Sequence, residues 1–319
     1  MDTPDEKTTW SVGWFFRGRG AVTVALLKFF SWLFAALPLP AALAAGRGLG
    51  RFFGAVVPRN RSRAMENLAR CLPEKSPAEC RAIMWRMFAN LGMNTVEMLR
   101  WLGGREAEMS GRICAENPEE LERALRRGRG VAILTAHCGN WDLMALWSAA
   151  RWPLTIISKE IKNAAVNRYW MEKRAVAGVK IVPAHHSYRQ CLGVLKKGGL
   201  LGFILDQNMI RREGIFVDFF GRPACTTPGL ALLAAHAQAP VLPVFMVRMA
   251  DGRHAVKFLS AMEPPADRKP ETLAAATQQY TKIIEDVIRE FPEQWIWMHR
   301  RWRTQPQPGE NERPPGGGV

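Results

Sequence analysis

The second half of the chain alternates between short apolar, β-prone runs and longer segments with helical spacing. This alternation predicts an α/β fold with a mostly parallel central sheet flanked by helices. The predicted strands are 131–136, 154–158, 179–182, 200–205, 241–248 and 254–259. The predicted helices between and after them are 141–150, 163–176, 186–196, 228–237 and 271–290.

The pattern before residue 131 is helical. Residues 60–102 have helical spacing, and 117–127 form another predicted helix that is rich in Glu and Arg. Ser76-Pro77-Ala78-Glu79 is a capping box with proline at the first helical position, so a helix is predicted to begin there. The apolar stripe of that helix favours packing in a core or against a membrane over a cofactor site; it comprises Ile83, Met84, Met87, Phe88, Leu91 and Met98.

The most apolar stretch is residues 20–46, which Lys28, Pro38 and Pro40 interrupt. A helix that spans a bilayer needs about 20 apolar residues with few charges. Arginines flank the stretch on both sides, so the positive-inside rule assigns no orientation. Three interpretations stay open: an interfacial or hairpin-like anchor, a single tilted span, and a buried core helix. A cleaved signal peptide fits less well, because acidic residues precede the basic region and no cleavage motif precedes a clear mature start.

Composition adds a charge argument. The formal net charge of +15 favours a polyanionic partner, which means nucleic acid, anionic lipid or an acidic carrier protein. Twelve tryptophans against three tyrosines favour a membrane interface, where a ring can be wet at one end and apolar at the other. The chain shows no nucleic-acid-binding motif. We therefore expect an anionic membrane surface as partner and no nucleic acid.

Candidate chemistry begins where the predicted strand from Val131 runs into His137, with Asp142 five positions later. Sites in open α/β sheets gather at the carboxyl ends of strands. On one straight helix the two side chains would lie about 140° apart, but Gly139-Asn140 permits a bend that brings them together. His137 is then a candidate general base and Asp142 its orienting carboxylate. The alternative is a structural histidine beside a helix cap.

Cys138 adjoins this histidine. Neighbouring strand residues point to opposite faces, so Cys138 is predicted to be a small packed residue rather than a nucleophile. The six cysteines are scattered, without a CxxC pair or zinc-ligand spacing, as expected of reduced thiols in a cytoplasmic setting. A second polar strand end, Asp206-Gln207, follows the apolar run 200–205 and is placed where a site is expected, although a plain turn would also fit.

These residues carry a family resemblance. His137 with Asp142 looks like the HX4D box of glycerolipid-type acyltransferases. Four further segments resemble one branch, the bacterial lipid A biosynthesis acyltransferases of the lauroyl and myristoyl type. They are Asp206-Gln207, Phe219–Ala224, the return strand from Ala239 and the run from Pro292 to Arg301. The run 292–301 is the most specific of these segments, and the resemblance extends to about Arg303.

The resemblance implies an inner-membrane enzyme whose catalytic domain faces the cytoplasm. It implies acyl transfer from acyl carrier protein to a hydroxyl of a Kdo-bearing lipid A precursor, with the carrier-bound thioester as donor and no metal or other cofactor. His137 would deprotonate the hydroxyl and Asp142 would orient His137. Arg174 matches an arginine position of the family and would hold a phosphate or the oxyanion, unless it is a solvated helix charge. Asp206 is similar to a family site position, and with Gln207 it is expected to bind substrate.

This interpretation divides the chain into a membrane anchor with an apolar helix (1–52), an acyltransferase domain (53–304) and a disordered tail (305–319). Two other functions stay open: acylation of another membrane glycolipid or aminolipid, and a membrane scaffold that has lost its chemistry. The intact His137 and Asp142 pair argues against the scaffold.

Overall fold

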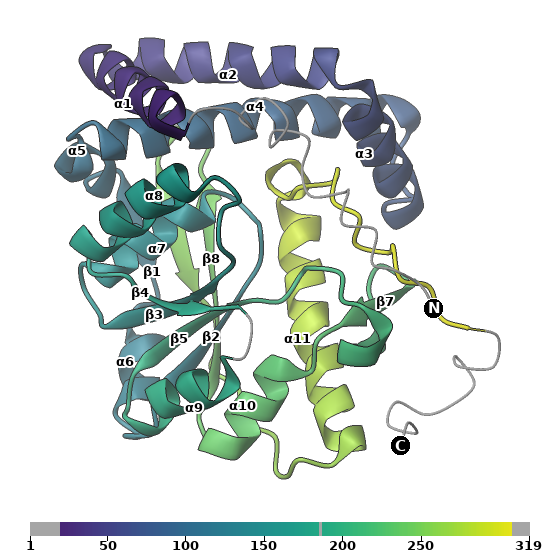
Figure 1. The fold of residues 1–319 in the computed structure, drawn as a ribbon. Helices are drawn as coiled ribbons and strands as arrows, with labels where there is room; N and C mark the ends of the chain where they lie inside the picture. The colour runs from purple at the N-terminus through teal and green to yellow at the C-terminus, as the bar shows by residue number, and fades with distance from the viewer. Residues whose placement is uncertain (1–19, 185–186, 308–319) are drawn as a thin grey trace.

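The computed structural model describes residues 20–184 and 187–307, and within them a seven-stranded sheet forms the centre of the molecule (Figure 1). Neighbouring strands are parallel except for one antiparallel pair, β8 with β9. In spatial order the strands are β1 (Ile113–Glu116), β9 (His254–Phe258), β8 (Val241–Arg248), β2 (Val131–Thr135), β5 (Leu200–Ile204), β3 (Leu154–Ser158) and β4 (Lys180–Pro183).

The six predicted strands are confirmed, with ends that shift by at most one residue. Sequence analysis missed β1, which has four half-buried residues and is too short to show an alternating pattern. It also missed a separate antiparallel hairpin of β6 (Ile215–Asp218) and β7 (Pro223–Thr226). The predicted α/β fold with a mostly parallel sheet is confirmed.

The predicted helices are also confirmed, and the capping box at Ser76 and Glu79 forms as expected. A short helix α5 (Glu106–Ser110) and two 3-10 turns, η2 (Arg211–Glu213) and η3 (Pro292–Gln294), were not predicted. The confirmed helices are α3 (Pro58–Cys71), α4 (Pro77–Leu102), α6 (Glu119–Leu125), α7 (Trp141–Ala149), α8 (Ala164–Val176), α9 (Tyr188–Lys196), α10 (Gly229–Ala237) and α11 (Pro270–Glu290).

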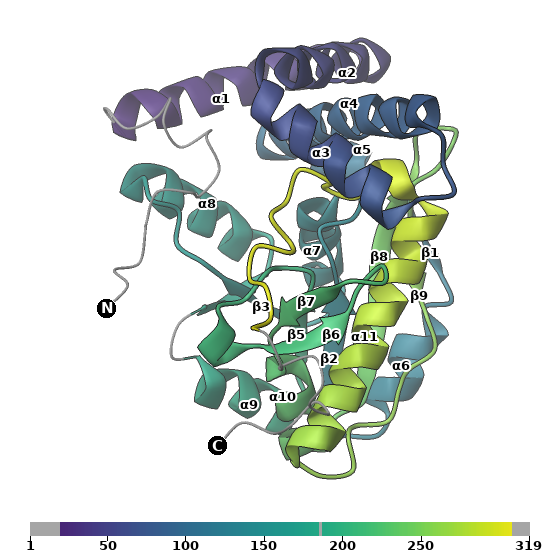
Figure 2. The same ribbon diagram turned by 90° about the vertical axis from the view of Figure 1, so that its right-hand side faces the viewer.

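Helices cover both faces of the sheet (Figures 1 and 2). Strand β2 is buried along its whole length: Val131 and Ile133 join a core that includes α6 and α7, while Ala132 and Leu134 join a core that includes α9, α10 and α11. A strand covered on both faces reads as one continuous apolar run. This is the physical reason why the run that leads to His137 could be recognised.

The apolar stretch near the N-terminus forms two helices rather than the single anchoring helix that was predicted. Helix α1 (Gly20–Ala36) ends before Pro38, and α2 (Leu39–Val56) begins just after it. Proline lacks an N–H and restricts the residue before it, so a helix usually breaks there. In the part of the chain that the structure describes, no helix combines the length and apolarity needed to cross a membrane.

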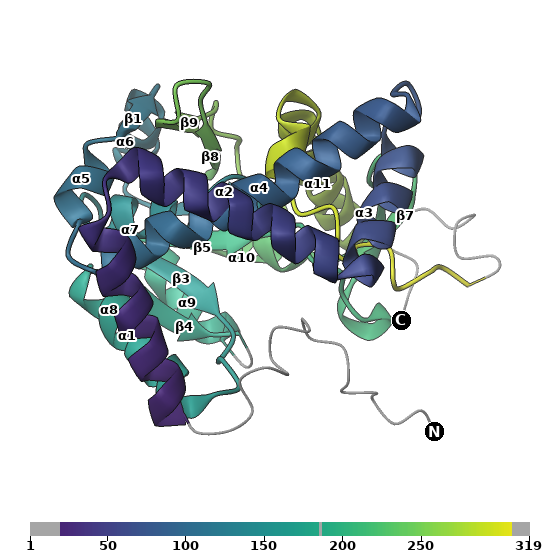
Figure 3. The ribbon, with the colours of Figure 1, turned by 90° about the horizontal axis from the view of Figure 1, so that it is seen from above.

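Helix α2 crosses over α4 (Figure 3), and glycines allow the two helices to approach closely. A Cβ atom added to Gly50 would lie 2.0 Å from the Phe88 carbonyl oxygen, and one added to Gly92 would lie 2.0 Å from the Gly46 carbonyl oxygen. Any larger residue at these positions would push the helices apart. Helices α1 to α4 thus form a layer over the carboxyl ends of the central strands, where the candidate site residues lie.

Candidate active site

His137 and Asp206 follow two adjacent parallel strands. In the pairing of β2 with β5, Thr135 lies opposite Ile204, and each candidate residue comes two positions later. His137 Nδ1 lies 2.8 Å from Asp206 Oδ1, and the His137 backbone N–H donates to Asp206 Oδ2 at 2.9 Å. One carboxylate therefore holds both the ring and the backbone of His137.

Asp206 is 3% exposed, and its Oδ2 also accepts a hydrogen bond from Trp295 Nε1 at 2.8 Å. Burial alone raises the pKa of this carboxyl, but the charge of His137 and the hydrogen bonds from His137 and Trp295 outweigh burial and hold the pKa well below its usual range. Asp206 is thus a buried, ionised acceptor with three donors. Such a carboxylate fixes the His137 tautomer that carries the proton on Nδ1.

The other ring nitrogen of His137 faces a cavity. Gln207 Nε2 lies 3.4 Å from His137 Nε2, and the two residues line a cavity of about 310 Å³ together with Trp141 and Ile296. The His137 side chain remains 19% exposed, so a substrate can reach it. Burial lowers its pKa, but the charge and hydrogen bond of Asp206 and the charge of Asp142 raise the pKa above its ordinary value overall. The arrangement suits a general base that acts through Nε2.

Asp142 does not occupy the place that the sequence predicted for it. Instead of contacting the His137 ring, Asp142 Oδ1 lies 2.5 Å from Arg174 Nη2, and Arg174 Nη1 donates to Ser158 Oγ at 3.2 Å. The predicted bend does occur, but Asn140 caps α7 there and Asp142 falls in its first turn. Asp206, which follows the neighbouring strand β5, contacts the His137 ring instead, so Asp206 rather than Asp142 makes the orienting contact.

The five predicted site residues thus form two groups. His137 lies with Asp206 and Gln207, and Asp142 lies with Arg174. The Arg174 side chain is 12% exposed and paired, which differs from a solvated helix charge. Sequence reasoning missed Ser158 and Trp295. Ser158 ends a predicted strand next to the site, and Trp295 belongs to the segment 292–301, so both had a positional signal. The catalytic and binding roles of these residues stay predictions.

Residues of β8, α4 and the C-terminal segment hold the turn that carries His137. Gly139 adopts a φ of +60°, and a Cβ atom there would lie 1.8 Å from the Met246 carbonyl oxygen, so no other residue fits. Asn94 Nδ2 donates to the Gly139 carbonyl at 2.8 Å, and the Gly139 N–H donates to the Gln294 carbonyl at 2.9 Å. The turn therefore depends on α4 and on the C-terminal segment as well as on its own sequence.

A buried carboxylate, Glu97, holds the next residue of this turn. Its Oε2 accepts a hydrogen bond from Asn140 Nδ2 at 2.9 Å, while Arg248 binds both carboxylate oxygens at 2.5 and 2.8 Å. His254 Nε2 lies 3.0 Å from Oε1. Burial alone raises the pKa of Glu97, but the hydrogen bond and charge of His254 and the contacts with Arg248 lower the pKa to about 2. Sequence analysis did not identify this residue, because an acidic side chain within a helix carries no local sign of burial.

Glu97→Ala is expected to lower the free energy of unfolding by about 3–5 kcal/mol, because it leaves the buried Arg248 without its charged partner. Urea unfolding followed by tryptophan fluorescence measures this change. Glu66→Ala is the matched control, since Glu66 pairs with Arg70 on the surface and its loss should cost less than about 1 kcal/mol. A loss in Glu97→Ala no larger than in the control would contradict the assignment. Because folding lowers the pKa of Glu97, its contribution is present at neutral pH and is lost as the pH falls from 4.5 toward 2.

Among residues 20–184 and 187–307, no group of three or more His, Cys, Asp or Glu side chains is arranged to hold a metal ion. The expectation that the reaction needs no metal or other cofactor stays a prediction.

Comparison of the sequence with known proteins finds similarity to acyltransferases. The family described as "Bacterial lipid A biosynthesis acyltransferase" matches residues 16–304. The chain is 29% identical to the lipid A biosynthesis palmitoleoyltransferase of Escherichia coli, over 86% of this chain and 89% of that protein. It is 26% identical to the lauroyltransferase of the same organism, over 86% and 90%. It is also 26% identical to a phosphatidylinositol mannoside acyltransferase of Mycolicibacterium smegmatis, over 58% and 60%.

Proposed function

The chain belongs to the bacterial lipid A biosynthesis acyltransferase family, and from this premise we propose that it moves a fatty acyl chain from acyl carrier protein to a hydroxyl of a Kdo-bearing lipid A precursor. Membership supports acyl transfer in lipid A biosynthesis; the donor and the acceptor are our proposal. The observation that carries the mechanism is the contact of His137 Nδ1 with the buried Asp206 carboxylate, which leaves Nε2 directed to the cavity.

The proposed reaction is a direct transfer. His137 Nε2 takes the proton of the acceptor hydroxyl while the oxygen attacks the thioester carbonyl, and the C–S bond then breaks. The imidazolium returns its proton to the departing thiolate. The Asp206 carboxylate stabilises the imidazolium, since it accepts the hydrogen bond from Nδ1. The Gln207 amide, 3.4 Å from Nε2, is placed to contact the reacting groups.

Arg174 and Asp142 form the second part of the proposed site. Arg174 is the candidate for binding a phosphate of the acceptor or the oxyanion, because a guanidinium offers several donors in one plane. Asp142 holds the guanidinium in place, and its charge also raises the pKa of the nearby His137. In this proposal Asp142 acts on His137 through its field rather than through a direct hydrogen bond.

The proposed location is the bacterial inner membrane, with the catalytic domain on its cytoplasmic face. Helices α1 and α2 support it, because both expose large apolar side chains and the chain carries a net charge of +15 that suits anionic lipid. The same charge suits an acidic carrier protein. The most exposed of these apolar residues are Val22, Phe29, Trp32, Leu49, Phe52 and Val56.

Mass spectrometry of lipid A from cells with and without the gene tests the proposed function. We expect the strain without the gene to yield lipid A that lacks one acyl chain, and purified enzyme to restore that chain from an acyl carrier protein thioester. A faster reaction with acyl-CoA would overturn the proposed donor. An unchanged lipid A profile would favour another glycolipid as acceptor, which the similarity to the mannoside acyltransferase keeps as the second candidate.

Cys138→Ala is expected to change the acyl transfer rate by less than about threefold. The thiol is 2% exposed and burial raises its pKa, so it is neither accessible nor ionised as a nucleophile must be. Steady-state assays with intact-protein mass spectrometry check this prediction. A large loss of rate in the variant, together with a trapped acyl-enzyme in the parent protein, would instead indicate a covalent route through Cys138.

A further inference from the structure

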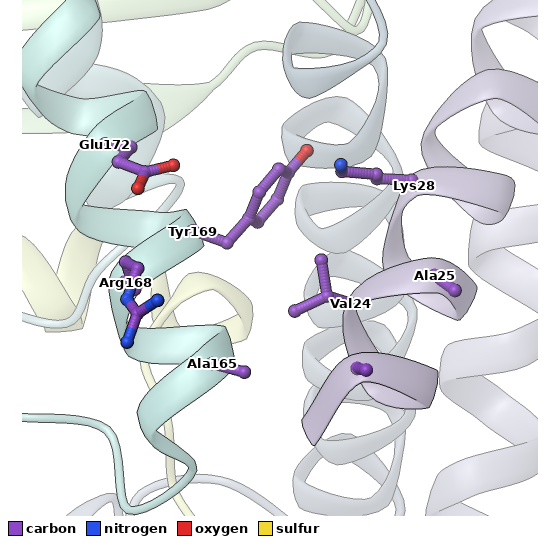
Figure 4. Close-up of a pocket in the computed structure, with 8 residues that line it drawn as sticks. Val24, Ala25, Lys28, Ala165, Arg168, Tyr169 and Glu172 are labelled. Carbon is purple, nitrogen blue, oxygen red and sulfur yellow. The ribbon is translucent and has the colours of Figure 1, made fainter. Parts of the chain in front are cut away.

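A second cavity lies between α1 and α8 (Figure 4), and it shares no lining residue with the cavity at His137. Its volume is about 380 Å³, against about 310 Å³ for the cavity at His137. The two helices touch at one end, where a Cβ atom on Gly20 would lie 2.8 Å from Ala165 Cβ. Two turns further along α1, Lys28 Nζ lies 5.7 Å from the centre of the Tyr169 ring. Between these contacts the helices leave an open groove, which we call the α1–α8 groove.

The α1–α8 groove combines positive charge with a small apolar wall. Figure 4 shows the Tyr169 ring reaching from α8 toward Lys28 on α1, with Arg168 on the same side of the groove as Tyr169. Lys173 Nζ also lies 5.8 Å from the Tyr169 ring centre. Lys28 and Lys173 thus flank the ring, Arg168 also lines the groove, and Glu172 is the single carboxylate among the lining residues, so the charge of the lining is positive. The apolar wall consists of Ala21, Val24, Ala25 and Ala165.

The buried position of Tyr169 favours a ligand with a polar group at the base of the groove. The side chain is 8% exposed, and burial raises the pKa of its hydroxyl, so the phenol stays neutral. A neutral phenol between cations can donate a hydrogen bond to an anion. A ligand with a compact negative charge therefore fits this end of the groove.

The faces of α1 show where the groove opens. Ala21, Val24, Ala25 and Lys28 follow helical spacing and form the groove face, while Ser31, Phe34 and Ala35 are buried against α4. At about 100° per residue, the exposed apolar face of α1 lies about 135° around the helix from the groove face. Trp32, which is 64% exposed, follows Lys28 by one turn on the groove side, so an apolar side chain suited to a bilayer interface adjoins the groove. The exposed apolar face comprises Val22, Leu26, Phe29 and Phe30.

We propose that the α1–α8 groove binds an anionic phospholipid of the bilayer. Its phosphate lies beside Lys28 and the Tyr169 hydroxyl, Arg168 adds positive charge on the α8 side of the groove, and the beginning of an acyl chain lies against the alanines and Val24. A helix that rests in the interface on its apolar face keeps the adjoining groove at the depth of the headgroups. Only a ligand with an anionic group joined to an apolar chain uses both the cations and the apolar wall. A free phosphate would leave that wall uncovered.

Flotation of the full-length protein with phosphatidylcholine vesicles, with and without phosphatidylglycerol, tests the proposal. We expect tighter binding to the vesicles that contain phosphatidylglycerol. The double substitution Lys28→Ala and Arg168→Ala should weaken that binding about tenfold or more, since each cation near an anionic surface contributes strongly. Val24→Trp fills the groove without changing charge, and it should remove most of the preference for phosphatidylglycerol while binding through the apolar face persists.

The matched control is Lys196→Ala with Lys197→Ala, which removes the same charge from exposed positions at and after the end of α9, at the opposite end of the molecule (Figures 1 and 2). It should weaken binding by less than about threefold, because charges beyond the Debye length are screened. Equal losses in the two double variants would overturn the site in favour of general surface charge. So would an unchanged preference in Val24→Trp, with thermal melting confirming that this variant is folded.

Competition with inorganic phosphate distinguishes a lipid site from a site for free anions. If millimolar inorganic phosphate removes the preference of the parent protein for phosphatidylglycerol, the lipid assignment is overturned in favour of a phosphate site. If the preference persists, the lipid assignment is supported. These measurements report lipid binding alone, so the proposal and the proposed acyl transfer can fail independently.

Discussion

Replacing His137 with alanine is expected to lower the rate of acyl transfer by about 10²–10⁴-fold, as the loss of a positioned general base does in other enzymes. The hydroxyl of the acceptor is a weak nucleophile, and His137 Nε2 is the basic nitrogen that faces the cavity. The rate measured with a carrier-bound acyl donor and a purified lipid A precursor checks this prediction. The Michaelis constants should change much less than kcat, because the imidazole acts on the transition state.

A loss of rate in His137→Ala indicates a catalytic role only if the variant is folded. Thermal melting of the His137→Ala variant should stay close to that of the parent protein, although Asp206 loses one of its partners. His236→Ala is a matched control, since His236 pairs with Tyr188 on α9 and lies outside the proposed site. It should keep the full rate. A His137→Ala variant that is folded and retains the parent rate would remove the general-base role.

Asp206→Asn is expected to lower kcat by about 10²–10³-fold. The substitution removes the charge that stabilises the His137 imidazolium, and it can place an amide donor against Nδ1, which favours the wrong tautomer. It also disturbs the contacts of the same carboxyl with Trp295 Nε1 and the His137 N–H. The rate and its pH dependence should therefore be measured together, with melting temperature as the check on folding.

The pH dependence separates an electrostatic role from a merely structural one. His137 must be neutral to accept a proton, and its pKa is raised in the folded protein, so the rate should rise with pH through an apparent pKa above 6.5. Without the Asp206 charge the pKa of His137 falls, so the acid limb of the profile should move to lower pH. The loss of rate should consequently be larger at high pH than at low pH.

Asp142→Asn distinguishes the two carboxylates. Asp142 contacts Arg174 rather than the His137 ring, so its substitution should affect acceptor binding through Arg174 and move the acid limb less than Asp206→Asn does. A larger shift of the limb in Asp142→Asn would restore the assignment that the sequence spacing first indicated. The two variants together decide which carboxylate controls the base.

Local sequence was sufficient for the elements that carry the site. The run Val131–Leu134 is apolar at every position because both of its faces are covered, and the capping box at Ser76 forms within four consecutive residues. Gly139 permits the positive φ that turns the chain between β2 and α7. Each of these features depends on residues close together in the chain, so its physical cause can be read from the sequence.

The partners of His137 and Asp142 depended on strand order instead. Asp206 reaches His137 across 69 positions because β5 pairs with β2, and Asp142 on α7 meets Arg174 on α8 across 32 positions. The five-residue spacing indicated that Asp142 contacts His137, which local geometry allows. The Asp206 carboxylate at the end of the neighbouring strand β5 contacts the His137 ring instead. Strand order arises from the burial of many distant apolar residues at once, and no short segment encodes it.

The sequence by itself therefore determined the alternation of strands and helices, the place of His137 at a strand end, and a resemblance strong enough to indicate lipid A acyl transfer. Only the tertiary structure decided that Asp206 holds the imidazole, that the buried Glu97 supports the turn, and that α1 and α8 enclose a charged groove. The difference has one physical reason. Backbone conformation follows from neighbouring residues, whereas the contacts of a charged side chain follow from which distant elements the core brings together.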